Sequence, residues 1–286
     1  MKKFIILIPI YNDWKSVFQL LENIDLQIAK WDAEVLVLII NDGSTEERTV
    51  TELSFKNIKT VRVMNMKQNR GHTRCNAVGL KYLTEKEDFD YVILMDGDGE
   101  DRPEELTSLF NKSKENPLKT VTANRIKRSE GSFFKLLYEC HKILTYVFTG
   151  KLIKFGNYSC LPKEDAARLV KEACIWSSFS GSVTKIISDR VSVPSIRGKR
   201  YFGPTQMNFF KLLIHSFSII AVFKRSAMVR SVLFLIFYLF FVFSNLSIFT
   251  LFPVFIIFIF LFLIFTVSSR ENTEALNNSL ESINNI

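Results

Sequence analysis

Three acidic residues alternate with glycines directly after a short apolar run near the middle of the chain. Asp96, Asp98 and Glu100 follow residues 91–95, which are Tyr, Val, Ile, Leu and Met. If the backbone stays extended, the three carboxylates project to one side and can share one cation. Ligands that offer only oxygen suit a hard ion such as Mg²⁺ or Mn²⁺, which keeps positions open for phosphate oxygens. The sequence therefore predicts a divalent-cation site at this junction.

Two alternatives to such a site are possible for this acidic segment. A calcium-binding loop of the EF-hand type that begins at Asp96 would need Gly at its sixth position and Glu at its twelfth, where Asp101 and Thr107 stand, and it is excluded. A helix start is the second alternative, because an Asp directly before the Arg-Pro pair at 102–103 is a good N-cap. Capping accounts for Asp101 but not for Asp96 or Asp98.

Short apolar runs alternate with helical patterns over the first part of the chain. Near-continuous apolar strands separated by helices predict an α/β fold with a mostly parallel sheet that helices cover on both faces. The expected strands are 4–9, 35–40, 58–64, 91–95 and 120–123, and the expected helices are 14–29, 74–83 and 103–114.

Polar segments follow three of these strands. Residues 11–13 (Tyr-Asn-Asp) come after the first strand, residues 41–44 (Asn-Asp-Gly-Ser) after the second, and residues 96–98 after the fourth. In open α/β sheets, ligands bind outside the carboxyl ends of the strands. We therefore expect the three segments to form one site at one edge of the sheet.

The C-terminal part of the chain is too apolar to be soluble. No charged residue occurs from 231 to 269, and a continuous helix of that length would measure about 60 Å, twice the hydrocarbon thickness of a membrane. We expect a hairpin of two membrane spans, 229–245 and 248–268, with one span plus a re-entrant piece as the alternative. Basic residues crowd its entry at 224–230, so the positive-inside rule places both of its ends, and the large N-terminal domain, on the cytoplasmic side of the inner membrane.

The 286 residues carry a net charge of +8, which is unevenly distributed. Residues 1–111 are net acidic, whereas 112–154 and 185–230 are strongly basic. The amphipathic patterns at 131–149 and 206–225 are typical of helices that lie at a membrane interface, with packing on the core as the alternative for the first. Anionic membrane lipids are the expected partners of this charge. Nucleic acid is not, because no nucleic-acid-binding motif accompanies the charge.

Together these motifs resemble the family 2 glycosyltransferases of GT-A fold, in the branch of dolichol-phosphate mannose synthase and the bacterial polyprenyl-phosphate glycosyltransferases. Residues 95–104, Met-Asp-Gly-Asp-Gly-Glu-Asp-Arg-Pro-Glu, parallel the family's Met-Asp-Ala-Asp-Leu-Gln-Asp-Pro-Pro-Glu. Further parallels are 8–13 with Pro-x-Tyr-Asn-Glu, 41–45 with Asp-Asp-Gly-Ser, 69–72 with Asn-x-Gly-Lys and 200–206 with Arg-x-x-Gly-x-Ser-Lys.

The resemblance implies a role for each matching residue. The nucleotide sugar would be bound by Pro9, Tyr11, Asp13, Asp42 and Asp96. A Mg²⁺ or Mn²⁺ ion on its diphosphate would be bound by Asp96, Asp98 and Glu100. The catalytic residues would be Asp98, Arg125 and Arg200. An acceptor phosphate would be held by the basic residues Arg125, Arg128, Lys135, Arg197 and Arg200.

The chain departs from the family pattern at four places. Asn41 and His72 stand where an Asp and a Lys are usual, and Gln206 replaces a Lys near the acceptor. Residues 155–159 occupy the place of an Asp-containing segment on the acceptor side.

The resemblance implies a metal-dependent, inverting transferase that moves a sugar from a nucleotide sugar to a polyprenyl phosphate at the membrane. Transfer to a hydroxyl of a lipid-linked saccharide is the alternative. That reaction needs a general base, and the Glu-Asp pair at 164–165 lies at an expected helix start, where acids suit the helix dipole. A non-catalytic, nucleotide-binding scaffold is a third hypothesis. The exposed hairpin could also pack against a second copy of the chain.

Four regions are expected along the chain. They are a GT-A catalytic domain at 1–200, an interfacial amphipathic region at 201–228, the transmembrane hairpin at 229–268 and a frayed, polar C-terminal tail at 269–286.

Overall fold

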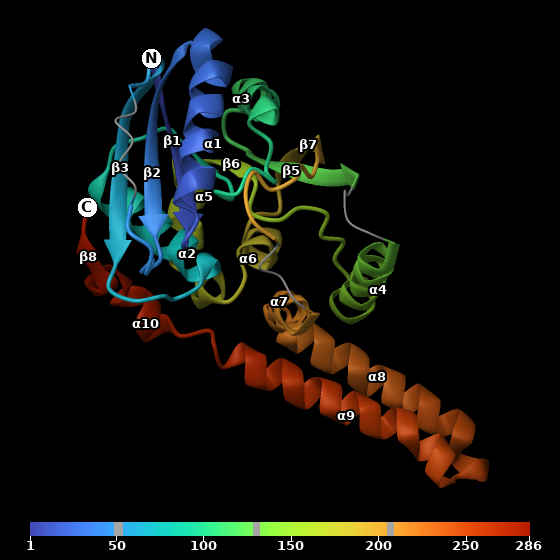
Figure 1. The fold of residues 1–286 in the computed structure, drawn as a ribbon. Coiled ribbons are helices and arrows are strands. Elements are labelled where there is room, and N and C mark those ends of the chain that lie inside the picture. Colours follow the sequence, from blue (N-terminus) through green and yellow to red (C-terminus); the bar gives the residue numbers. More distant parts are fainter. Residues whose placement is uncertain (49–53, 128–131, 205–208) are drawn as a thin grey trace.

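The computed structural model describes residues 1–48, 54–127, 132–204 and 209–286. Over these residues the chain forms a sheet flanked by helices, from which two long helices project (Figure 1). The strands are β1 (Lys2–Ile10), β2 (Ala33–Asn41), β3 (Ile58–Met66), β4 (Tyr91–Leu94), β5 (Thr120–Lys127), β6 (Ser159–Pro162), β7 (Arg190–Ile196) and β8 (Ile283–Asn285). Their order across the sheet is β7-β5-β6-β4-β1-β2-β3-β8.

The sheet is mostly parallel, as predicted. β1 runs parallel to β2 and β4, β2 to β3, and β5 to β7. β6 lies antiparallel between β4 and β5, and β8 pairs antiparallel with β3. The five predicted strands correspond to β1 to β5. β6, β7 and β8 were not predicted. Runs of four and three residues, as in β6 and β8, are too short to show a period, and β7 contains Pro194, which is unusual inside a strand.

Helices cover both faces of the sheet. α1 (Trp14–Gln27) and α3 (Leu106–Glu115) pack on one face. The other face carries α2 (His72–Lys86), α5 (Lys163–Leu169) and α6 (Phe179–Ile186). Strand β1 is therefore buried on both sides, which explains its uninterrupted apolar run.

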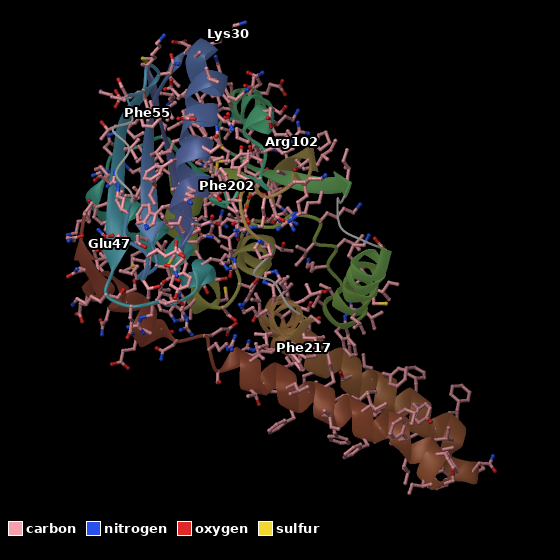
Figure 2. The ribbon with its side chains drawn as sticks, viewed as in Figure 1. Lys30, Glu47, Phe55, Arg102, Phe202 and Phe217 are labelled. Atoms are coloured by element: carbon pink, nitrogen blue, oxygen red, sulfur yellow. The ribbon has the colours of Figure 1, made fainter. Side chains whose placement is uncertain are left out.

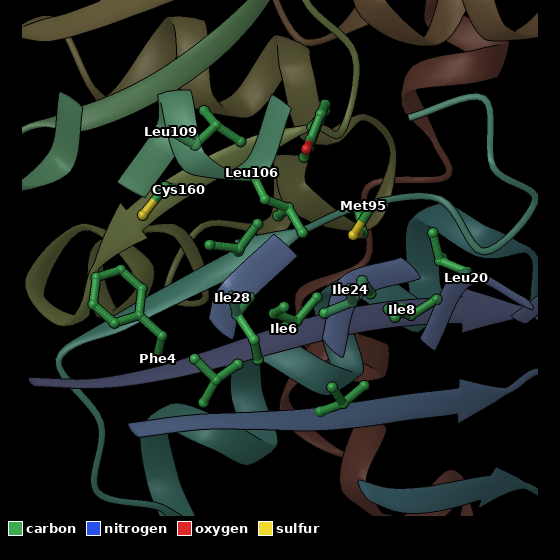
Figure 3. Packing of buried hydrophobic residues seen from close by; sticks show 14 of the residues in the cluster. Phe4, Ile6, Ile8, Leu20, Ile24, Ile28, Met95, Leu106, Leu109 and Cys160 are labelled. Atoms are coloured by element: carbon green, nitrogen blue, oxygen red, sulfur yellow. The ribbon is translucent and has the colours of Figure 1, made fainter. Parts of the chain in front are cut away.

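The packing of α1 on the sheet shows why this segment is helical. The buried residues of α1 recur at helical spacing, so that one apolar stripe of the helix faces the sheet. Figure 3 shows Leu20 and Ile24 of this stripe close to Ile6 and Ile8 of β1. Fully burying a side chain of this size contributes about 1.5–3 kcal/mol, so this packing fixes the strand whose end carries the first predicted loop of the site.

The expected helical hairpin is present at the C-terminal side. α8 (Lys224–Val242) and α9 (Ile248–Ser268) lie side by side and are joined near Ser247, whose Oγ accepts a hydrogen bond from the backbone of α9. The stretches Lys224–Asn245 and Ile248–Asn277 are long and apolar enough to cross a membrane, judged by length and composition. In Figure 2 the side chains that project from this hairpin are almost entirely carbon.

The two amphipathic helices form the base of this hairpin. α4 (Ser132–Thr149) contacts α7 (Phe209–Ala221) and α8, and α7 contacts α9 and α6. α7 thus lies between the sheet domain and the apolar hairpin, and α4 lies beside α7 and α8.

The C-terminal tail is not frayed, and that expectation was wrong. After α9 the chain returns to the sheet through α10 (Thr273–Asn277) and ends in β8, which lies beside β3. Leu276 is 1% exposed and packs in the core below α2. The sequence predicted fraying from polarity, but a few apolar side chains on a short segment are enough to anchor it. The boundaries between the four predicted regions remain predictions.

Candidate active site

Three loops meet at the carboxyl edge of the sheet. β1, β2 and β4 are parallel neighbours, so the loops 11–13, 42–45 and 95–102 that follow them end at the same edge. The first two loops are tied together by Asn12, whose N–H donates to Ser44 Oγ at 2.9 Å. Asn12 has a φ of 51°, a left-handed conformation that Asn tolerates better than most residues. The predicted convergence of the polar segments is therefore present.

The acidic loop 95–102 turns sharply, and the expectation of extended backbone was wrong. Gly99 has a φ of 86°, and Glu100 N donates to Asp98 Oδ1 at 2.9 Å. Asp101 is 4% exposed, and its carboxylate accepts the N–H of Asp96 at 3.0 Å. Asp101 thus closes the turn. It does not cap the helical turn Pro103–Glu105, whose N-cap is Arg102 without a side-chain hydrogen bond.

Residues 197–204, called the strap below, lie across the acidic loop. Two backbone hydrogen bonds attach the strap, from Gly198 N to Glu100 O at 2.8 Å and from Tyr201 N to Asp98 O at 3.0 Å. A Cβ at Gly99 would lie 2.6 Å from the Tyr201 ring, so the close approach of loop and strap requires glycine at this position.

Arg200 of the strap bridges two of the three loops. Its Nη1 lies 2.7 Å from Asp98 Oδ2, and its Nη2 lies 2.5 Å from Asp13 Oδ2. All three side chains are less than one-fifth exposed, so this charge is poorly screened by water. Arg197, also on the strap, forms an ion pair with Glu100. The structure therefore brings together Asp13, Asp98, Arg197 and Arg200, all predicted as site residues.

The other side of the acidic loop faces the segment 155–159. Asn157 Nδ2 donates to Asp96 Oδ1 at 2.9 Å. A Cβ at Gly156 would lie 2.5 Å from Arg125 Nη2, so Arg125 lies directly over this glycine. The segment 155–159, where the chain departs from the family pattern, thus contacts the predicted site residues: it supplies an amide to Asp96 and leaves room for Arg125.

Burial and neighbouring charges together shift the pKa values of the carboxyls of the site in opposite directions. Burial raises the pKa of Asp98 to about 6, and the neighbouring carboxylates Asp96 and Glu100 contribute to this rise. Burial and Asp96 raise the pKa of Asp101 to about 7. Burial also opposes ionisation of Asp96, but His72, Arg197 and other donors outweigh it and hold the pKa of Asp96 below its usual value. Neighbouring groups with divergent pKa values are typical of functional sites.

Asp42 has a structural role, in addition to the predicted binding of a nucleotide base. It is 3% exposed, and its two oxygens accept the backbone N–H groups of Arg70 at 2.6 Å and Gly71 at 2.8 Å. Asp42 thereby fixes the loop before α2. Each carboxylate oxygen keeps a second lone pair, so binding of a nucleotide base by Asp42 stays a prediction.

The remaining predicted residues are distributed as follows. Pro9 is buried in β1, where its carbonyl lies close beneath Gly97 of the acidic loop. Tyr11 is 47% exposed at the same edge, as a residue that contacts a ligand would be. Lys135 lies in α4. Arg128 falls outside the described residues.

A divalent cation fits part of the predicted ligand set. Asp96 and Asp98 are close enough for the charge of Asp96 to raise the pKa of Asp98, and both offer the oxygen donors that Mg²⁺ or Mn²⁺ prefers. Glu100 is engaged by Arg197. Among the residues that the structure describes, no three acidic, histidine or cysteine side chains are grouped to hold a metal ion. A shared ion is thus compatible with Asp96 and Asp98, and Glu100 remains a predicted ligand, with one of its oxygens engaged by Arg197.

Some residues of the site were not predicted from the sequence. Asn157 binds Asp96, and Tyr201 packs on Gly99 while its hydroxyl accepts from Asn23 at 2.9 Å. Asn12 ties two loops together. The only available signal for these residues was their position inside segments already singled out, because single amide side chains carry no spacing pattern.

The mostly parallel sheet, with helices on both faces and polar loops at its carboxyl edge, is a fold of the GT-A type. The family model "Glycosyl transferase family 2" matches residues 5–175, which is more than half of the chain. The chain therefore belongs to glycosyl transferase family 2.

Curated relatives are similar over most of the chain. The undecaprenyl-phosphate 4-deoxy-4-formamido-L-arabinose transferases of two Klebsiella pneumoniae strains are each 26% identical to it over 218 residues. The match covers 74% of this chain and 64% of the relative's length.

Solved structures share the fold at low sequence identity. One of them is glucosyl-3-phosphoglycerate synthase from Mycobacterium tuberculosis in complex with Mn²⁺, UDP-glucose and phosphoglyceric acid. It superposes with a TM-score of 0.53 at 13% sequence identity, and the match covers 79% of this chain and 80% of the synthase chain. Mannosyl-3-phosphoglycerate synthase from Rubrobacter xylanophilus gives a TM-score of 0.54 at 13% identity, with 78% and 73% covered. The predicted GT-A architecture is thereby confirmed.

Proposed function

We propose that this protein is a metal-dependent, inverting glycosyltransferase that moves a sugar from a nucleotide sugar to a polyprenyl phosphate at the cytoplasmic face of the inner membrane. The observation that carries the proposal is the position of Arg200, which lies between Asp13 of the first loop and Asp98 of the acidic loop. A guanidinium at this point can bind a diphosphate while negative charge grows on it. The strap that holds Arg200 precedes α7 and the apolar hairpin in sequence.

Two similarities support the choice of substrates. The curated relatives are named for transfer to undecaprenyl phosphate, which supports a polyprenyl phosphate acceptor. The solved glucosyl-3-phosphoglycerate synthase contains UDP-glucose with Mn²⁺, which supports a nucleotide-sugar donor and a divalent ion. The apolar hairpin supports residence in a membrane with a lipid acceptor nearby.

The acidic and basic residues of the site would have different roles in binding the donor. Asp96 and Asp98 would hold a Mg²⁺ or Mn²⁺ ion, which when bound neutralises charge on the departing diphosphate. Arg200 would exchange its bond to Asp98 for a phosphate oxygen. Pro9, Tyr11, Asp13 and Asp42 would line the nucleotide side of the pocket at the edge described above.

The acceptor side would use the remaining cations. Arg125 and Arg197 flank the acidic loop, and Arg128 and Lys135 would contribute further positive charge to the acceptor phosphate. A guanidinium fork matches a phosphate, and the acceptor oxygen is already an anion, so no strong base is needed. Attack from the face opposite the departing diphosphate would invert the anomeric carbon.

Transfer to a hydroxyl is less well supported. The candidate base Asp165 is 6% exposed, accepts a hydrogen bond from Thr120 Oγ1 at 2.7 Å and pairs with Arg168. A carboxylate used in this way stabilises the fold, and it is poorly placed to take a proton from an incoming substrate.

The test is a transfer assay on membranes that contain the full-length protein. Radiolabelled nucleotide sugars are supplied with Mn²⁺, and the lipid extract is treated with mild acid. Mild acid releases the label of a polyprenyl sugar phosphodiester as a monosaccharide. Label on a hydroxyl of a lipid-linked saccharide is instead released within a larger saccharide, because the bond between that saccharide and its lipid is also acid-labile. We expect a labelled monosaccharide that disappears with EDTA and with Asp98→Asn but not with Glu104→Gln. A larger labelled saccharide would favour the hydroxyl acceptor, and a lipid extract without label would contradict both.

A further inference from the structure

The C-terminal tail is connected to the nucleotide side of the site by a row of three asparagines. Asn41, Asn65 and Asn285 are register partners on the adjacent strands β2, β3 and β8. Asn41 Nδ2 donates to Asn65 Oδ1 at 2.8 Å, and Asn65 Nδ2 donates to Asn285 Oδ1 at 2.6 Å. We call this row the asparagine ladder. It is continuous from the last strand of the chain to the end of β2.

The ladder continues into the loops of the site. Asn41 Oδ1 accepts the N–H of Ser44 at 3.0 Å, and Ser44 Oγ in turn accepts the N–H of Asn12. Asn12 Oδ1 accepts the backbone N–H groups of Thr45 at 2.8 Å and Glu46 at 3.1 Å. The ladder thus ends on the two loops that carry Tyr11, Asp13 and Asp42, the predicted nucleotide-binding residues.

The tail is also attached to the loop that Asp42 fixes. Lys67 N donates to Ser282 O at 2.9 Å, close before the backbone of Arg70 and Gly71 that Asp42 binds. Leu276 and the partly buried Leu280 pack in the core below α2, which begins at the end of this loop. The tail therefore contacts the nucleotide edge along two routes.

The ladder gives a physical reason for Asn41, where the family pattern has Asp. An amide can accept from Ser44 N and donate to Asn65 at the same time, whereas a carboxylate can only accept. The residue that departs from the pattern is thus the one through which the tail reaches the site.

We propose that residues 271–286 are a positioning element of the donor site, which acts on the loops 11–13 and 42–46 through the asparagine ladder. This inference rests on the proposed function for its effect on nucleotide binding, but not for its effect on the loops. The tail follows α9 directly, and Glu271 pairs with Lys224 of α8 at 3.0 Å. The donor loops are therefore tied to the base of the hairpin as well as to the sheet.

The direct test removes the hydrogen bond between Asn65 and Asn285 in the full-length protein. Asn285→Leu removes the oxygen that accepts a hydrogen bond from Asn65, whereas Asn285→Asp keeps an oxygen at this position. Asn284→Leu is the control, because it makes the same substitution one residue away. Hydrogen–deuterium exchange of the peptide that contains residues 44–46 reports on the loop without any ligand. Titration of the Mn²⁺-loaded variants with UDP, GDP, CDP, ADP and dTDP reports on nucleotide binding.

We expect Asn285→Leu to speed exchange at residues 44–46 and to weaken binding of the preferred diphosphate by about 2- to 10-fold, the worth of one net hydrogen bond. Asn285→Asp and Asn284→Leu should stay close to wild type in both measurements. Unchanged exchange in Asn285→Leu, or equal effects of Asn285→Leu and Asn284→Leu, overturns the proposal. If wild type binds no diphosphate, the proposed function fails, and the exchange measurement alone decides the ladder.

The direction of the hydrogen bonds provides a second test. Asn41→Asp can be accommodated if Asn65 and Asn285 both reverse their amides, so that donation runs from the tail toward β2. In Asn41→Asp/Asn285→Asp, Asn65 faces an acceptor on each side and can satisfy only one. Exchange at residues 44–46 should therefore be faster in the double variant than the two single effects predict. Additive effects would overturn the ladder as the coupling route.

Discussion

Replacing Asp98 by Asn should stabilise the metal-free protein although it removes a site residue. Burial and the carboxylates of Asp96 and Glu100 raise the pKa of Asp98 from 3.8 to about 6. Ionised Asp98 therefore costs folding free energy at neutral pH. At 1.36 kcal/mol per pKa unit, the cost at pH 7 is up to about 3 kcal/mol. The neutral amide of the Asp98→Asn variant would carry no such cost, and Arg200 would keep its bond to Asp13.

The effect of Asp98→Asn on stability should depend on pH in a direction that follows from the raised pKa of Asp98. The folded-state pKa of Asp98 lies above the unfolded value, so the cost of ionisation grows as the pH rises from about 3.8 and is complete above about 6. The advantage of Asp98→Asn should therefore be largest at pH 7 and fall below about 1 kcal/mol at pH 4.

The assay is thermal unfolding of the full-length protein in detergent with EDTA, followed by intrinsic fluorescence at pH 7 and pH 4. An advantage of about 3 kcal/mol corresponds to a rise in melting temperature of roughly 6–10 °C. Glu104→Gln is the matched control, because Glu104 is 54% exposed beside the same loop. It should change the melting temperature little at either pH. If Asp98→Asn melts below wild type at pH 7, or if its advantage is the same at both pH values, the electrostatic account of the acidic loop is refuted.

Three further predictions follow from the described contacts. Asp42→Ala removes two hydrogen bonds to backbone amides, so we expect about 3–6 kcal/mol lower stability by denaturant unfolding, and a loss below about 1 kcal/mol would contradict this role. Gly99→Ala should displace Tyr201 and reduce transfer at least about 10-fold, whereas Gly203→Ala, also at positive φ but facing open space, should retain most transfer; equal losses would rule out the steric explanation. A reporter fused after residue 286 should be active in the cytoplasm, because the tail returns to the sheet domain, and activity only outside the cytoplasm would refute this topology.

The arrangement of the sheet could be predicted because its cause is local. The continuous apolar runs of β1, β2 and β4 show strands buried on both faces, and their spacing leaves room for one helix between each pair. Parallel strands place their carboxyl ends together, so the meeting of Tyr11, Asp42 and Asp98 at one edge followed from the pattern alone.

The conformation of the acidic loop could not be predicted, because it depends on distant residues. Asp101 folds back onto Asp96 N, and the strap, about a hundred residues further along the chain, supplies Arg200 and Tyr201. Alternation of Asp and Gly is compatible with extended backbone and with a turn. The choice is made by the strap, for which the sequence predicted an acceptor-side role of Arg197 and Arg200 but no contact with the acidic loop.

The conformation of the C-terminal tail also depends on a segment that is distant in sequence. Its polar composition predicted fraying, yet Leu276 is buried and β8 pairs with β3. Polarity describes how much a segment gains from burial on average. Here a few apolar side chains, among them Leu276 and Leu280, and a row of asparagines are sufficient, because β3 leaves an edge to which the tail can pair.

The most direct test of the central claim uses the purified full-length protein with a polyprenyl phosphate and a panel of nucleotide sugars, and detects the lipid product by mass spectrometry. The account predicts one product, a polyprenyl phosphate that has gained one sugar. It should form with one nucleotide sugar, require Mg²⁺ or Mn²⁺ and be absent with Asp98→Asn. Undiminished product with Asp98→Asn or in EDTA, or no product from any donor of the panel, would contradict the account.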